Sequence, residues 1–228
     1  MALFVQPKMV VWMISPLNYI EEEQARTFRK WGISAVAVNS TTKFDSVKDD
    51  ILAGRYQVVI LSPENFCRSN KLRLIVVSDE LQSWFHATVI NEAHCVHTWG
   101  KQFRVAYDRC GDMHGYMPPE SPFLAATATC MEEIEKKLRA RLFIREHPHV
   151  ENLGNFRENI EYGVYVMVGG LKSSYKEICK FIPTRGVLRR TIIFVDSIKD
   201  AYHILAVLQD HLGLEDGDME LVQPYHAL

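Results

Sequence analysis

Several features that mark particular classes of protein are missing from this 228-residue chain. Its five cysteines form no C-x-x-C pair, a pattern that favours free thiols in a reducing compartment over a disulfide framework. Net charge is small: 26 Lys and Arg stand against 28 Asp and Glu, so overall charge demands no nucleic-acid partner. No basic segment leads into a long apolar run near the N-terminus, and residues 9–14 are too few to span a bilayer. We therefore expect an intracellular, soluble protein, nuclear if its source is a eukaryote.

Glycine is scarce at the start of the chain. The first glycine is Gly32, and the single Gly-Lys pair, Gly100-Lys101, is followed by Gln102. A phosphate-binding loop of the form G-x-x-x-x-G-K-[ST] needs closely packed backbone amides and one Lys to hold the phosphates. The sequence contains no such loop.

Segments typical of strands and helices alternate along most of the chain. Near-continuous apolar runs predict strands at 9–14, 34–38, 57–61, 88–90 and 122–126, with helices at 18–31, 46–53 and 132–142. A second series has predicted strands at 162–168 and 191–195 and helices at 174–181 and 198–212. This alternation favours an open parallel α/β sheet, and the break around residues 152–155 predicts a domain boundary.

Polar residues follow several of these strands, where ligands bind in open parallel sheets. Ser15 follows the first predicted strand, Ser62 the third, Glu92 the fourth and Thr127 the fifth. We predict that these four residues lie at one edge of the sheet. Taken singly, each also suits a turn that caps the next helix.

The order of these short motifs resembles the RecQ branch of the superfamily 2 helicases, whose motifs run S-P-L, S-P-E, D-E-A-H-C with W-G-x-x-F-R, and T-A-T. This chain has S-P-L at 15–17, S-P-E at 62–64, N-E-A-H-C at 91–95, W-G-K-Q-F-R at 99–104 and T-A-T at 127–129. Residues 155–160, 192–197 and 225–228 resemble segments of the second motor lobe. The resemblance implies a RecA-like α/β fold, with a near-complete first lobe at 1–152 and a partial second lobe at 153–228. It also implies ATP-driven 3′-to-5′ unwinding of DNA. The implied DNA partner is a single strand or a fork.

The resemblance assigns a nucleotide role to four residues. Glu92 would orient or activate the water that attacks ATP, and His94 would couple the nucleotide site to the DNA-facing segment. Thr127 and Thr129 would belong to the nucleotide-linked T-A-T segment. The alternative interpretation is an exposed acid at a strand end and a histidine with a structural role.

The resemblance assigns a DNA role to Ser15, Trp99, Phe103, Arg104 and Tyr107. Aromatic rings stack on bases and an Arg holds a phosphate. The alternative is a helix face that buries the three rings, which recur every four residues. Basic stretches at 68–73 and 136–141 either touch phosphates or form solvated faces.

The sequence also departs from the family pattern. Asn91 stands where the family has the Asp that holds magnesium, and an amide lacks the charge that this cation prefers. Lys101 and Gln102 replace a His-Asp pair, and the chain stops before the second-lobe arginines. We therefore expect ATP and Mg not to be bound productively, so that the chain is an inactive piece of a RecQ-like helicase. The alternatives are a non-catalytic remnant that binds DNA or a partner, and an unrelated α/β binding domain.

Glu92, His94, Cys95 and His97 invite a metal interpretation as well. Their spacing fits neither a helical H-E-x-x-H site nor a paired-cysteine zinc site. We therefore predict no metal site at this segment.

Overall fold

The structure, a computed structural model, describes residues 9–39, 42–98, 104–154, 157–166, 171–184, 189–215 and 219–226. Contacts within the chain divide it into two compact units, Met1–Phe156 and Arg157–Leu228. This division lies close to the boundary predicted after residue 152. Within the described ranges, every helix is too short or too polar to cross a membrane.

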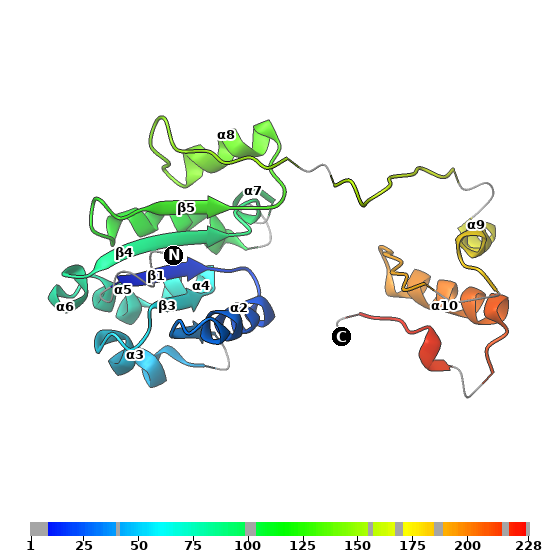
Figure 1. Ribbon diagram of the computed structural model, residues 1–228, viewed down its shortest axis with the longest axis horizontal. Coiled ribbons are helices and arrows are strands. Elements are labelled where there is room, and N and C mark those ends of the chain that lie inside the picture. Colours follow the sequence, from blue (N-terminus) through cyan, green and yellow to red (C-terminus); the bar gives the residue numbers. More distant parts are fainter. Residues whose placement is uncertain are drawn as a thin grey trace. The chain divides into compact units, whose positions relative to one another are not determined.

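The first unit is built on a five-stranded sheet with the order β2-β3-β1-β4-β5 (Figure 1). The strands are β1 (Met9–Ile14), β2 (Ala35–Val38), β3 (Val58–Leu61), β4 (Phe85–Asn91) and β5 (Phe123–Ala126), and every pairing is parallel. The five strands predicted for this unit are thus confirmed, and the parallel sheet with helices on both faces is the RecA-like α/β fold.

Helices cover the two faces of this sheet unequally. One face packs its core against α3 (Phe44–Leu52), α4 (Pro63–Arg68), α5 (Asn70–Val76), α6 (Asp79–Gln82), α7 (Cys95–Thr98), the 3-10 helix η1 (Val105–Gly115) and α8 (Glu132–Arg141). The other face packs against α2 (Asn18–Lys30), which contributes Ala25 and Phe28. Successive strand residues point to opposite faces, so Trp12 and Ile14 enter the first core while Met9 and Val11 enter the second. Burial on both faces explains the uninterrupted apolar runs.

A buried histidine is satisfied inside this core. Trp12 Nε1 donates to His86 Nδ1 at 3.1 Å, and His86 Nε2 lies 2.5 Å from the carbonyl oxygen of Leu81, to which it donates. A neutral ring uses both nitrogens in this arrangement. Burial lowers the pKa of His86, and the bond to Leu81 opposes that shift. This histidine is therefore a structural residue of β4.

The segment after α7 differs from the predicted face with a four-residue period. Residues 105–115 form a 3-10 helix, which turns once every three residues, and it buries Tyr107, Cys110 and Met113 at a spacing of three. Tyr107 is 0% exposed. The alternative in which the ring is buried is therefore the correct one for Tyr107. Trp99 and Phe103 lie outside the described residues.

The second unit contains the two predicted helices but not the predicted strands. The helices are α9 (Leu171–Ile178), followed by the 3-10 turn η2 (Cys179–Phe181), and α10 (Ile198–Leu212); a further turn, η3, spans Met219–Leu221. Tyr175 on α9 donates to Asp200 on α10 at 2.5 Å. The described residues 162–166 and 191–195 form no strand, and Val164 and Phe194 are 98% and 90% exposed. The strand prediction is wrong there, because a strand needs a paired neighbour and these segments have none among the described residues.

Candidate functional site

The carboxyl ends of the strands gather the predicted motif residues at one edge of the first unit. Ile14 lies opposite Leu61 in β3 and Ile90 in β4, and Asn91 lies opposite Ala126 in β5. Ser15, Ser62, Glu92 and Thr127 follow these paired positions. The prediction that they share one edge is therefore confirmed.

Glu92, His94 and Thr127 form a hydrogen-bonded group at this edge. His94 Nδ1 lies 2.8 Å from Thr127 Oγ1 and 3.3 Å from Glu92 Oε2. The turn that brings Glu92 and His94 together needs a left-handed backbone at Glu92, with φ of 50°. The group joins the segment after β4 to the T-A-T segment after β5, as the resemblance implied for these motifs.

The hydrogen bonds around His94 favour one arrangement of its protons. The Thr127 hydroxyl donates to the Thr129 carbonyl oxygen and accepts from the Thr129 N–H, both at 3.2 Å, so it also accepts from His94 Nδ1–H. His94 Nε2 then faces the Cys95 sulfur at 3.7 Å. Burial, with a further contribution from the charge of Glu92, raises the pKa of Cys95 to about 11, so its thiol keeps the proton and donates it toward Nε2.

Arg104 joins three of the motif segments. Its Nε lies 2.7 Å from Glu64 Oε1, its Nη2 binds Glu64 Oε2, and its Nη1 donates to the Pro16 carbonyl oxygen. These contacts tie the W-G-x-x-F-R segment to the S-P-E helix and to the S-P-L turn. The Arg104 side chain is only 18% exposed. It is thus engaged within the protein, and a role for Arg104 in DNA binding stays a prediction.

A buried acid close to Arg104 escaped the sequence analysis. Glu21 on α2 is 0% exposed, and its carboxylate oxygens have no hydrogen-bond partner of ordinary geometry in the described part of the chain. Burial raises the pKa of Glu21 to about 7, while Asn39 and the charge of Arg104 oppose the shift. Ala25 lies four positions after Glu21 and is also buried. An apolar residue at this helical spacing was the available signal that Glu21 faces inward.

The remaining predicted DNA residue, Ser15, is also buried. It is 0% exposed, and its assignment to DNA binding stays a prediction. Sequence reasoning missed Tyr19, two positions beyond the S-P-L turn, whose ring is 76% exposed at this edge. An exposed aromatic ring beside a strand end offers a stacking surface.

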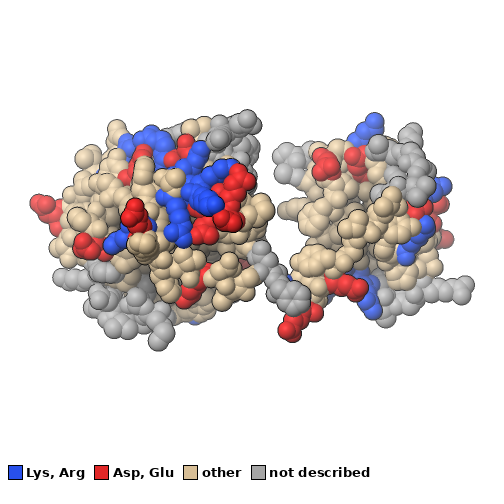
Figure 2. Space-filling model, turned by 90° about the horizontal axis from the view of Figure 1, so that it is seen from above, with Lys and Arg blue, Asp and Glu red and all other residues tan. Residues whose placement is uncertain are grey.

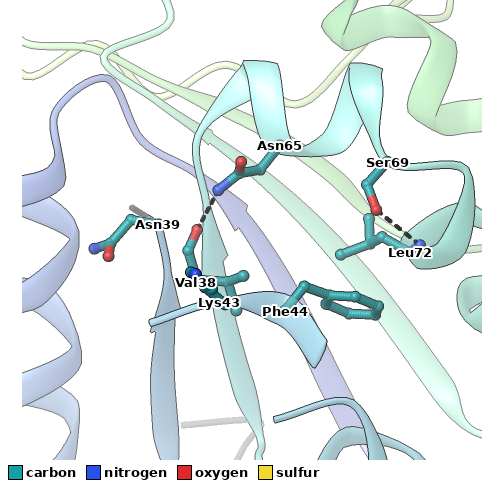
Figure 3. A pocket seen from close by; sticks show the side chains of 7 residues that line it. All are labelled: Val38, Asn39, Lys43, Phe44, Asn65, Ser69 and Leu72. Atoms are coloured by element: carbon teal, nitrogen blue, oxygen red, sulfur yellow. Dashed lines mark hydrogen bonds between the residues drawn. The ribbon is translucent and has the colours of Figure 1, made fainter. Parts of the chain in front are cut away.

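A small cavity of about 210 Å³ opens where β2 ends (Figure 3). Its lining consists of Val38, Asn39, Lys43, Phe44, Asn65, Ser69 and Leu72. Two of its polar groups serve the fold: Asn65 Nδ2 on α4 donates to the Val38 carbonyl oxygen at 2.6 Å, and Ser69 Oγ caps α5 by accepting from the Leu72 N–H at 3.1 Å. The cavity therefore lies where α4 joins the end of β2 and where α5 is capped.

The basic stretch at 136–141 is paired with acids, most of them on its own helix, while Arg141 binds Asp108 on η1. Lys136 binds Glu132 at 2.6 Å, and Arg139 binds Glu135 at 2.5 Å. Figure 2 shows the result on the face of the first unit seen from above, where basic and acidic side chains are interspersed. This pairing favours the solvated-face interpretation of the stretch.

The residues at the magnesium position do not fit that cation. Asn91 ends β4 with an uncharged amide, and the carboxylate of Glu92 is turned toward His94. Magnesium prefers carboxylate and water oxygens in octahedral geometry. In the described ranges, no group of three His, Cys, Asp or Glu side chains could hold a metal ion.

The DEAD/DEAH box helicase family matches residues 2–137, which is more than half of the chain. The chain belongs to this family. Its RecQ-like character is shown by its relatives. The ATP-dependent DNA helicase RecQ of Pasteurella multocida is 29% identical over 92% of this chain and 33% of that protein. The RecQ protein of Haemophilus influenzae is 28% identical over 92% of this chain and 34% of that protein. The chain thus spans about a third of the length of these RecQ relatives.

Among solved structures, the helicase domain of Hef from Pyrococcus furiosus aligns with 64% of this chain. The alignment includes 29% of the Hef chain, with 17% sequence identity and a TM-score of 0.44.

Proposed function

We propose that this RecQ-like chain binds single-stranded DNA along the carboxyl edge of its sheet and does not hydrolyse ATP. The observation that carries the proposal is the junction at Arg104. It joins the S-P-L, S-P-E and W-G-x-x-F-R segments at one edge. Two of these, S-P-L and W-G-x-x-F-R, contain residues to which the RecQ resemblance assigns a DNA role. The names of the RecQ relatives describe ATP-dependent DNA helicases, which supports DNA as the partner.

DNA contact in this proposal depends on exposed groups rather than on Arg104. Tyr19 stands beside the S-P-L turn with most of its ring open to solvent, and one base can stack on it. Arg104 acts as a positioning residue that ties the start of η1 to α4 and to the S-P-L turn. The overall charge of −2 offers no general attraction to phosphates, so we expect weak binding that is lost at high salt.

In this proposal the chain does not hydrolyse ATP because of the side chains at the magnesium and water positions. Phosphoryl transfer depends on metal-bound charge stabilisation and on a positioned water. Asn91 supplies no charge for magnesium, and the Glu92 carboxylate lies 3.3 Å from His94 Nδ1. The His94–Thr127 link is kept, so the motif segments remain coupled structurally while the chemistry is lost.

The test uses two exposed aromatics at opposite ends of one helix. Tyr19 lies at the start of α2, at the carboxyl edge, whereas Trp31 follows the end of α2 and is 61% exposed. We would measure fluorescence anisotropy of a short single strand with the parent chain, Tyr19→Ala and Trp31→Ala, at two salt concentrations. Stacking contributes about 1–3 kcal/mol per base, so Tyr19→Ala should weaken binding about ten-fold. Trp31→Ala should bind like the parent. Equal losses in both variants, or no binding by the parent at low salt, would contradict the proposal.

A further inference from the structure

Two thiols converge between α4 and η1 in the first unit. Cys67 Sγ lies 3.5 Å from the carbonyl oxygen of Ala106, and Cys110 Sγ lies 3.8 Å from the same oxygen. Cys67 is half-buried, whereas Cys110 is only 1% exposed. All five cysteines of the chain are free thiols, and these two share an acceptor from different elements. Both sulfurs therefore lie beside one carbonyl oxygen, and burial together with the charge of Cys67 raises the pKa of Cys110.

We propose that Cys67 and Cys110 form a dithiol site that glutathione disulfide, or a disulfide of similar chemistry, converts to an internal disulfide bond. The site lies apart from the Glu92–His94–Thr127 group and does not depend on the proposed function. Its two elements are already held together at one end, because Glu64 on α4 binds Arg104 at the start of η1. The bond would fix α4 to η1 at a second point.

The reaction proceeds in two exchanges. The thiolate of Cys67 attacks one sulfur of glutathione disulfide, which breaks that disulfide and releases one glutathione thiolate. The thiolate of Cys110 then attacks the Cys67 sulfur of the mixed disulfide, which forms the Cys67–Cys110 bond and releases the second glutathione. The protons of the two cysteines end on the two glutathione thiolates. The protein is oxidised by two electrons, and glutathione disulfide is reduced to two glutathione molecules.

Burial decides the order and the rate of these steps. Cys67 is the more accessible sulfur, so glutathione disulfide reaches it first. Burial raises the pKa of both thiols, although the charge of Arg109 opposes the shift at Cys67. Little thiolate is present at neutral pH, and the exchange should therefore be slow and accelerate in alkaline solution. A disulfide has sulfurs about 2 Å apart, so at least one side chain must turn away from Ala106.

The other cysteines are placed less well for such a bond. Cys130 is exposed, Cys179 belongs to the second unit, and Cys95 is buried with its sulfur facing His94. The experiment therefore uses the full chain with Cys130→Ser and Cys179→Ser, which removes two accessible thiols that would otherwise take up glutathione. This background is incubated with oxidised glutathione at about pH 8.5 and analysed by mass spectrometry without reduction.

The expected product is a chain lighter by two hydrogens, with Cys67 and Cys110 in one linked peptide that separates on reduction. Adding Cys110→Ala should stop the reaction at a mixed disulfide on Cys67. Adding Cys67→Ser should leave Cys110 unmodified, because glutathione does not reach it. A background chain that stops at the mixed disulfide, or that links either cysteine to Cys95, would overturn the proposal. Both of these outcomes are measured on the background chain alone, so they count against the proposal even if a Cys67 or Cys110 variant fails to fold.

Discussion

Arg104 donates to both carboxylate oxygens of Glu64, from a position 40 residues further along the chain. The two side chains are 18% and 26% exposed, so water screens their attraction only in part. The same guanidinium binds the carbonyl oxygen of Pro16, and it lies 5.4 Å from the ring centroid of Tyr107. One side chain thus connects the segments that follow β1, β3 and β4.

Removing either partner of this pair should destabilise the first unit. A hydrogen bond to a charged group contributes about 1.5–3 kcal/mol, and partial exposure lowers that figure, so we expect Arg104→Ala and Glu64→Ala each to cost about 1–2 kcal/mol. The double variant should lose less free energy of unfolding than the two single variants together, because each single substitution removes the same interaction. Urea denaturation measures these free energies of unfolding.

The control for this cycle is an exposed pair on η1. Arg109 binds Asp112 at 3.0 Å with both side chains largely in solvent, so the same cycle there should give no measurable coupling. If the Arg104 and Glu64 variants are strictly additive, the pair does not stabilise the edge.

Glu21 should make stability depend on pH. Its native pKa is about 7, against an ordinary value of 4.5 expected in the unfolded chain. Between these values the unfolded chain has released the proton while the native chain still holds it. The free energy of unfolding should therefore fall as pH rises from about 4.5 to about 7 and stay low above that, by about 3 kcal/mol in total.

Glu21→Gln tests this dependence. The variant should lose the slope between pH 4.5 and 7 and be more stable than the parent above pH 7, because no buried charge forms. Glu23→Gln, on the same helix at an exposed position, should keep the slope. The charged groups that act on Glu21 are Arg104, Glu22 and Glu64. A parent chain whose stability rises through this range would show that a different group controls it.

The parallel sheet could be predicted because its signal is local. Strands β1, β2 and β3 are apolar runs buried on both faces. Helix α10 begins after the cap Ser197 and ends before Gly213, as its sequence indicates. The shared edge of Ser15, Ser62, Glu92 and Thr127 followed from topology alone. These features need no knowledge of distant contacts.

Other features depend on contacts that no local pattern reveals. The short helices α4 and α5 begin at Ser62 and Ser69, whose hydroxyls accept from Asn65 and Leu72 N–H groups, yet each is too short for an amphipathic period. The family resemblance assigns Tyr107 a DNA-facing role, whereas its burial depends on the packing of a 3-10 helix that turns every three residues. Glu21 stands in a run of three acids that suggests a solvated face, and only tertiary packing buries it.

Gly54 is expected to tolerate no side chain. Its φ is 67°, and a Cβ there would lie 1.6 Å from the Trp84 ring. Gly54→Ala must therefore displace the ring as well as strain the backbone, and we expect a loss of about 2–4 kcal/mol. Gly32 has a similar φ of 77° with nothing within 4 Å of a Cβ, so Gly32→Ala should cost only about 1 kcal/mol. Equal losses in urea denaturation would show that contact with Trp84 is unimportant.

The last prediction concerns ATP. The purified chain should show no DNA-stimulated phosphate release above that of Glu92→Gln. Hydrolysis needs a charged metal ligand and a carboxylate that positions water, whereas Asn91 carries an amide and the Glu92 carboxylate faces His94 Nδ1 at 3.3 Å. Asn91→Asp should also remain at the Glu92→Gln level, because the chain has no G-x-x-x-x-G-K-[ST] loop to hold the phosphates. Turnover in the parent that disappears in Glu92→Gln would contradict the proposed loss of hydrolysis. If Asn91→Asp hydrolyses ATP and the parent chain does not, the Asn91 amide is the group that prevents hydrolysis.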